Sequence, residues 1–280
     1  MPYFIRDKIN FHYLQRRLSS TPALIFQHGL GGDTERVFDL LGPLPGVSFF
    51  GLDCRGHGDT SPLGDIEKLG FDSFADDVIA LMEHLGLQQT IIGGTSMGAG
   101  VALNCILRYP HRFMGLILLR PAWLDGPMGA NATAFGLVAQ LLREHGPQNG
   151  LEIFKCSDVY KSIFSESPDS ANSLLESFSH PRSLETVAKL ERLPQDAPNR
   201  DRSEWRQILH PTLVLANRSD PIHPFEFGRV LAENIPNADF AELMPKSVNL
   251  AQYTADLRSN VTAFLQKHWP FTFPAQSDYA

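Results

Sequence analysis

The most informative segment of the chain runs Ile91-Ile92-Gly93-Gly94-Thr95-Ser96-Met97-Gly98-Ala99-Gly100. It opens as an apolar run typical of a buried strand, and the residues from Val101 to Tyr109 that follow it have the pattern of a helix. Gly94, Ser96 and Gly98 form the pattern G-x-S-x-G between the two. A serine at so sharp a turn takes a strained backbone conformation that exposes its hydroxyl, and small neighbours let strand and helix approach each other. The segment therefore predicts a nucleophilic serine, Ser96, beside helix amides that can stabilise an anionic intermediate.

Apolar runs of strand length alternate with amphipathic segments of helix length along most of the chain. The expected helices include Thr34 to Leu41, Phe74 to Leu85 and Leu250 to Lys267. After a polar-alternating hairpin, the expected strands read as continuous apolar runs, which is typical of strands buried on both faces. The hairpin and strands are Tyr3 to Arg6, Asn10 to Arg16, Ala23 to Gln27, Val47 to Leu52, Thr90 to Gly93, Gly115 to Leu119, Thr212 to Ala216 and Asp239 to Leu243. The pattern predicts an α/β fold with a mostly parallel central sheet covered by helices.

The pattern changes between Pro121 and Arg206, where polar, helix-like sequence is interrupted by several prolines. We expect residues 121–206 to form an inserted helical cap, and residues 1–120 and 207–280 to form the α/β core. Ligands of open α/β sheets bind outside the carboxyl ends of the strands, so a cap inserted here would cover that crevice. Its expected role is to shape substrate choice and not to supply the reaction chemistry.

Composition narrows the range of partners. The 280 residues include 24 Lys and Arg against 31 Asp and Glu, a formal net charge of −7, which argues against a nucleic-acid partner. No apolar run approaches the roughly 18 residues of a membrane-spanning helix, and Arg6, Asp7 and Lys8 interrupt the start where a signal peptide would be apolar. Three cysteines without metal-ligand spacing argue for reduced thiols and against a bound metal. We therefore expect a cytoplasmic protein without a cofactor that acts on a small molecule away from membranes; no motif sets an oligomeric state.

These features resemble those of the α/β-hydrolase superfamily, and the resemblance extends over nearly the whole chain. His28-Gly29-Leu30-Gly31-Gly32 is similar to the family's oxyanion loop, which implies that the backbone amides of Leu30 and Met97 hold the oxyanion. Asp53-Cys54-Arg55-Gly56-His57-Gly58 is similar to the family's D-x-R-G-x-G turn, a scaffold feature. The resemblance implies an α/β-hydrolase fold with a helical cap, and structural roles for His28 and His57.

The acid of the expected catalytic triad follows from the same resemblance. The stretch Asn217-Arg218-Ser219-Asp220-Pro221-Ile222-His223-Pro224 looks like the family's acid loop and places Asp220 as the triad carboxylate. Asp125 is an alternative acid, because some relatives draw the acid from the region after the Gly115 to Leu119 strand. Arg120 and Trp123 stand where the cap begins and could line the pocket. Arg120 would there fix an anionic substrate group or form a structural salt bridge.

The general base is the point at which this chain departs from the family. The family's histidine stands on the loop after the last strand, but the corresponding Leu243-Met244-Pro245-Lys246-Ser247-Val248-Asn249 contains no histidine. His223, in the acid loop, is the first candidate because an imidazole is well suited to accept a serine proton near neutral pH. Lys246 is the second, because a desolvated lysine can act as a base. The third alternative is that hydrolysis has been lost.

The sequence thus predicts a serine hydrolase that acts on a small ester, thioester or lactone under a helical cap. Ser96, Asp220 and His223 are its expected catalytic residues. Two alternatives remain open. The scaffold could bind a small ligand without hydrolysing it, or it could use the same residues as a carbon–carbon hydrolase or a cofactor-free haloperoxidase-like enzyme.

Overall fold

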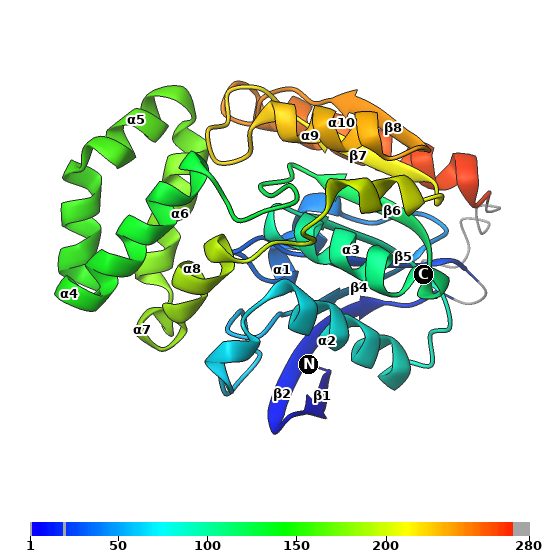
Figure 1. The fold of residues 1–280 in the computed structure, drawn as a ribbon, viewed down its shortest axis with the longest axis horizontal. Helices are drawn as coiled ribbons and strands as arrows, with labels where there is room; N and C mark the ends of the chain where they lie inside the picture. Colours follow the sequence, from blue (N-terminus) through cyan, green and yellow to red (C-terminus); the bar gives the residue numbers. More distant parts are fainter. Residues whose placement is uncertain (1, 19–20, 271–280) are drawn as a thin grey trace, which may run out of the picture.

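The computed structural model describes residues 2–18 and 21–270. Its centre is an eight-stranded sheet with the order β1-β2-β4-β3-β5-β6-β7-β8 (Figure 1). The strands are β1 Tyr3–Arg6, β2 Ile9–Arg16, β3 Ala23–Gln27, β4 Ser48–Leu52, β5 Thr90–Thr95, β6 Phe113–Leu119, β7 Thr212–Ala216 and β8 Ala238–Glu242. Strand β2 pairs antiparallel with β1 and with β4, whereas the other neighbours pair parallel. The predicted mostly parallel sheet is confirmed.

Helices cover both faces of the sheet. One face carries α1 (Thr34–Leu41) and α10 (Leu250–His268). The opposite face carries α2 (Phe71–His84), α3 (Met97–Arg108) and α9 (Phe225–Asn234). Successive side chains of β3 point to opposite faces, so Leu24 and Phe26 pack with α1 and α10 whereas Ile25 packs with α2 and α3. Every residue of β3 is buried, which explains why the central strands are continuously apolar.

The predicted cap consists of helices that stand together beyond one end of the sheet (Figure 1). They are α4 (Thr133–Cys156), α5 (Asp158–Glu166), α6 (Pro168–Ser179), α7 (Ser183–Thr186) and α8 (Ala188–Arg192). Helix α4 is kinked at Gly146, which has φ 71°, directly before Pro147. The helical insertion is confirmed, while its limits of 121–206 and the extent of the core, 1–120 and 207–280, stay a prediction. Residues 271–280 of that core lie outside the described residues.

Short 3₁₀ helices complete the secondary structure. They are η1 (Ile66–Lys68), η2 (Pro110–Arg112), η3 (Ala130–Ala132), η4 (Leu193–Gln195) and η5 (Arg202–Gln207). Across residues 2–18 and 21–270, each helix is too short or too polar to cross a membrane.

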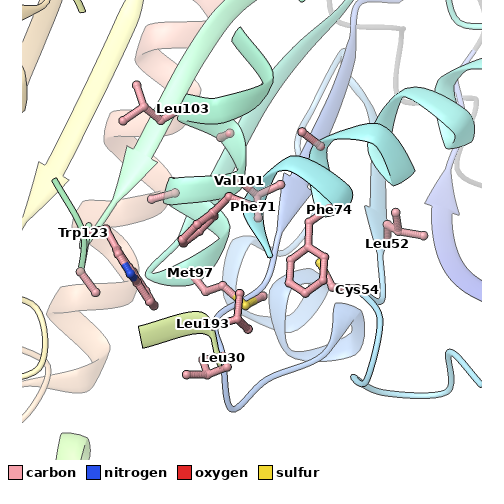
Figure 2. Packing of buried hydrophobic residues seen from close by; sticks show 14 of the residues in the cluster. Leu30, Leu52, Cys54, Phe71, Phe74, Met97, Val101, Leu103, Trp123 and Leu193 are labelled. Atoms are coloured by element: carbon pink, nitrogen blue, oxygen red, sulfur yellow. The ribbon is translucent and has the colours of Figure 1, made fainter. Parts of the chain in front are cut away.

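One buried cluster joins the core, the cap and the segment around Ser96 (Figure 2). The side chains of Leu30, Met97 and the cap's Leu193 belong to it and lie close together. Phe71 and Trp123 meet edge to face beside them, with ring centroids 5.2 Å apart. Full burial of a leucine or methionine side chain contributes about 1.5–3 kcal/mol to folding. This packing therefore fixes the backbone on both sides of the Ser96 hydroxyl.

Candidate active site

Ser96 occupies a single-residue turn between β5 and α3. Its backbone has φ 57° and ψ −115°, a conformation that costs about 1–3 kcal/mol for a residue other than glycine. The Ser96 amide donates to the carbonyl of Leu119 at 3.0 Å, and the Ala99 amide donates to the Ser96 carbonyl at 3.0 Å. The strained conformation is therefore held from both sides by neighbouring backbone.

The two glycines of the G-x-S-x-G pattern are required by close backbone contact. A Cβ added to Gly94 would lie 2.2 Å from the backbone of Gly98. A Cβ added to Gly98 would lie 2.2 Å from the carbonyl oxygen of Gln27, at the end of β3. Both contacts are far shorter than van der Waals distance, so only glycine allows α3 to begin this close to β3 and β5.

The loop after β3 lies directly against Ser96. A Cβ on Gly29 would stand 3.4 Å from the Ser96 Cβ. The loop is closed by a hydrogen bond from the Gly32 amide to the Gly29 carbonyl at 2.9 Å. Within the described residues, no protein acceptor engages the amide of Leu30 or that of Met97, the first residue of α3. Both amides therefore remain available to a ligand.

His28 and His57 connect the loop after β3 to the turn after β4. His28 Nε2 accepts from the Cys54 amide at 3.1 Å, and its Nδ1 lies 2.8 Å from the Gly29 carbonyl. His57 Nε2 lies 3.0 Å from the Leu30 carbonyl. Both rings are fully buried, and burial lowers the pKa of each imidazole. These contacts fix the position of the loop and support the structural roles that the resemblance implies.

Asp220, in the loop after β7, is surrounded by hydrogen-bond donors. Its Oδ1 accepts from the amides of Ile222 and His223, both at 3.2 Å, and from the Ser170 hydroxyl at 2.9 Å. Its Oδ2 accepts from Arg120 Nε at 2.9 Å, from Arg120 Nη2, and lies 2.9 Å from His223 Nδ1. Burial by itself would raise the pKa of Asp220, but His223 and Arg120 outweigh it and hold that pKa far below its usual value. The carboxylate is therefore a fixed, permanently ionised partner of the imidazole.

Ser96 and His223 open onto the same cavity of about 150 Å³. The cavity is lined by the loops that follow β3, β5, β6, β7 and β8, by α1, and by cap helices α4 and α6. Asp220 stands behind His223 and does not line the cavity itself. Burial lowers the pKa of His223; Asp220 opposes this effect and Arg120 adds to it. Among the described residues, no hydrogen bond joins the Ser96 hydroxyl to His223 or to Lys246.

The other two candidates named from the sequence lie in different surroundings. Lys246 also lines the cavity, but its ammonium group pairs with Asp169 of α6 at 2.6 Å. Asp125 is not part of the cavity wall; it pairs with Arg202 at 2.8 Å, and this contact lowers its pKa. The Lys246 side chain is therefore engaged by a carboxylate, and among the described residues no hydrogen bond or ion pair joins Asp125 to His223.

The cap supplies one group that sequence reasoning missed. Ser170 lies in the first turn of α6, is almost completely buried, and donates its hydroxyl to Asp220. Ser167 caps the helix by accepting from the Ser170 amide at 3.3 Å, and its hydroxyl donates to that of Ser170 at 3.0 Å. The local sequence indicates only that a helix begins at Pro168. It cannot indicate the hydrogen bond from Ser170 to Asp220, because these two residues are 50 positions apart in the chain.

Comparison with known proteins agrees with this fold. The family described as "alpha/beta hydrolase fold" matches residues 22–247, which is most of the chain. The chain therefore belongs to the α/β-hydrolase family.

Individual relatives cover nearly the whole chain at low identity. The chain is 26% identical over 249 residues to 3-oxoadipate enol-lactonase 2 of Acinetobacter baylyi, covering 88% of this chain and 89% of the lactonase. It is 27% identical over 255 residues to the AB hydrolase superfamily protein YisY of Bacillus subtilis, covering 88% and 90%. Among solved structures, the enol-lactonase from Burkholderia xenovorans has a TM-score of 0.73 at 20% identity, covering 95% of this chain and 100% of the lactonase. At that identity the structural likeness establishes the fold alone.

Proposed function

We propose that the protein is a serine hydrolase of small esters, thioesters or lactones, with Ser96 as nucleophile and His223 as general base. The observation that carries this proposal is the shared cavity. The strained turn exposes Ser96 to it, and the imidazole of His223, backed by the ionised Asp220, opens onto the same space. The enol-lactonase among the curated relatives supports a lactone or ester as substrate.

The reaction follows from these positions. Ser96 Oγ attacks the carbonyl carbon of the substrate while His223 Nε2 accepts the hydroxyl proton, and the carbonyl oxygen becomes an oxyanion. The amides of Leu30 and Met97 donate hydrogen bonds to that oxyanion. The intermediate then expels the alcohol or thiol, which takes the proton from His223, and an acyl group stays on Ser96. A water molecule, deprotonated by His223, releases the acyl group and restores the serine.

His223 is favoured over Lys246 as base by the contacts of each. Asp220 Oδ2 lies 2.9 Å from His223 Nδ1 and is an ionised acceptor, so it favours the tautomer in which Nδ1 carries the proton and Nε2 carries the free lone pair. Lys246 instead forms an ion pair with Asp169 of the cap. A hydrogen bond between a serine and its base is often long without substrate and shortens in the substrate complex, so the lack of a Ser96–His223 hydrogen bond among the described residues does not argue against this role.

The cavity beside Ser96 is small, about 150 Å³, and is open to solvent. It accommodates a short ester group such as acetyl or butyryl. Short p-nitrophenyl esters are therefore the appropriate first substrates.

The test is the hydrolysis of p-nitrophenyl acetate and butyrate by the wild type, Ser96→Ala and Ser165→Ala. Ser165 lies in cap helix α5, where its exposed hydroxyl contacts only the Ser162 carbonyl among the described residues, so its variant is the matched control. We expect Ser96→Ala to reduce kcat by at least about a thousandfold and Ser165→Ala to leave it unchanged. Full activity of Ser96→Ala would refute the proposed mechanism.

A second candidate function is ligand binding without hydrolysis. It is favoured by the ion-paired Lys246 at the position where the family carries its histidine. A wild-type protein that turns over neither ester between pH 5 and 9, but binds a short ester as measured by calorimetry, would establish this alternative.

A further inference from the structure

Arg120 connects the acid and the base of the proposed triad. It is the first residue after β6 and has φ 46°, in the left-handed region that is unfavourable for residues other than glycine. Its Nε and Nη2 both donate to Asp220 Oδ2, and Nη2 lies 3.1 Å from His223 Nδ1. Tyr253 of α10 lies beneath the guanidinium, 6.0 Å from ring centroid to Cζ. A strained backbone thus presents a largely buried guanidinium to both residues.

The geometry of Arg120 compensates for the short link between acid and base. Asp220 and His223 belong to one turn, whose amides occupy Asp220 Oδ1. The imidazole must therefore use Oδ2, and Arg120 approaches that same oxygen from β6, a different strand. Ser170 holds the other oxygen from the cap. With both oxygens engaged from separate elements, the carboxylate cannot rotate away from the imidazole.

Arg120 also changes the charge balance of this buried group. The guanidinium already neutralises the Asp220 carboxylate, so a proton on His223 gives the group a net positive charge. Without Arg120, the same proton would neutralise the carboxylate instead. The nearby Lys246 and Asp169 pair with each other, and Tyr253 is an uncharged phenol whose pKa is raised by burial. Arg120 therefore adds to the effect of burial and opposes the tendency of Asp220 to favour a protonated imidazole.

We propose that Arg120 is a positioning residue that aligns Asp220 with His223 and keeps His223 neutral in weakly acidic solution. The inference rests on the proposed role of His223 as base. Protonated His223 cannot accept the Ser96 proton, so Arg120 extends activity to lower pH. Arg120 lines the cavity beside Ser96, but its Nε and Nη2 are engaged by Asp220 and Nη2 also lies against His223, so its proposed action is through these two residues.

The expected effect is a shift of the acidic limb of the pH profile. In the wild type, kcat/KM for p-nitrophenyl butyrate reaches half its plateau below pH 6.5, the usual histidine value, because burial and Arg120 lower the pKa of His223. In Arg120→Met, which keeps side-chain length and removes the charge, the midpoint rises by about one unit or more, the usual effect of a charge within about 4–6 Å. Arg120→Lys keeps the charge but loses the planar guanidinium that donates two hydrogen bonds to Asp220. Its midpoint therefore stays near that of the wild type while kcat falls.

A direct titration of His223 separates this inference from the proposed function. The imidazole signals of the labelled protein are followed by NMR between pH 4.5 and 9, and His223→Ala identifies the His223 signal. We expect the titration midpoint of His223 to rise by at least about one unit in Arg120→Met and to stay within about half a unit in Arg120→Lys. Arg120→Gln replaces Arg120→Met if the latter does not fold. An unchanged midpoint in the folded uncharged variant overturns the role of Arg120. If the titration midpoint of His223 shifts as expected but the wild type hydrolyses no ester, the role of Arg120 stands and only the proposed function is wrong.

Discussion

Replacement of Gly98 by alanine tests whether the turn at Ser96 depends on backbone contact. The added Cβ would lie 2.2 Å from the Gln27 carbonyl oxygen and 2.7 Å from that of His28. The first contact falls about 1.2 Å short of the 3.4 Å at which ordinary contact begins. Both atoms belong to the backbone at the end of β3, so the clash is not relieved by a change of side-chain rotamer. Either α3 or the loop that carries Leu30 must move.

The magnitude follows from the cost of overpacking. Extra groups in a packed interior typically cost 1–3 kcal/mol, and more when backbone has to shift, so we expect Gly98→Ala to lower the unfolding free energy by about 3 kcal/mol or more. This is a large share of the 5–15 kcal/mol that is typical of native proteins. The assay is equilibrium unfolding in guanidinium chloride. The unfolding free energies are compared once the two proteins are shown to have the same dependence of that free energy on denaturant concentration.

Gly136→Ala is the matched control for this substitution. Gly136 lies within α4, and nothing stands within 4 Å of its added Cβ. Alanine is favoured over glycine inside a helix by about 0.8–1 kcal/mol, so this variant should be as stable as the wild type or slightly more stable. If the unfolding free energy of Gly98→Ala lies within about 0.5 kcal/mol of the wild-type value, the turn does not depend on this backbone contact.

Two further predictions concern proton-accepting groups. We expect His223→Ala to lower kcat/KM for p-nitrophenyl butyrate by about a hundredfold or more and Lys246→Ala by less than about tenfold; the reverse order would assign the base to Lys246. Lys189, in cap helix α8, donates to the Gly56 carbonyl, and burial followed by the charge of Arg182 lowers its pKa from 10.5 to about 7. The unfolded chain therefore binds more protons between about pH 7 and 10.5, and stability should rise with pH in that window. Denaturant unfolding should show this rise in the wild type and lack it in Lys189→Met, and parallel pH dependence in both proteins would contradict the assignment.

The strands could be predicted because burial on both faces leaves a plain signal. The apolar runs of β3 and β7 coincide with the observed strands, since every position in them is buried. Two helices were harder to predict, and glycine is the reason in each. Helix α3 begins at Met97 and not at Val101, because close contact with β3 requires Gly98 inside the helix. The sequence pattern does not predict a helix at α9, whose Gly228 is needed because a Cβ there would lie 2.8 Å from the Ala216 Cβ.

The candidate site was predictable where its chemistry is local. The G-x-S-x-G pattern specifies the turn at Ser96 because its glycines contact backbone within the same motif and the adjacent strand. The ion pair of Lys246 with Asp169 and the hydrogen bond from Ser170 to Asp220 were not predictable, because they depend on how the cap docks. From the sequence, Arg120 could bind an anionic substrate group or form a structural salt bridge. The structure shows a salt bridge, with Asp220 as the partner.

Covalent labelling of the wild type with a fluorophosphonate, followed by peptide mapping, tests most directly whether Ser96 is an activated nucleophile. An activated serine attacks phosphorus and displaces fluoride, so we expect one label per chain on Ser96, lost in Ser96→Ala and strongly slowed in His223→Ala. Labelling should weaken below pH 6.5 as His223 takes up a proton. If the folded wild-type protein stays unlabelled between pH 5 and 9, or is labelled at another serine, Ser96 is not the nucleophile.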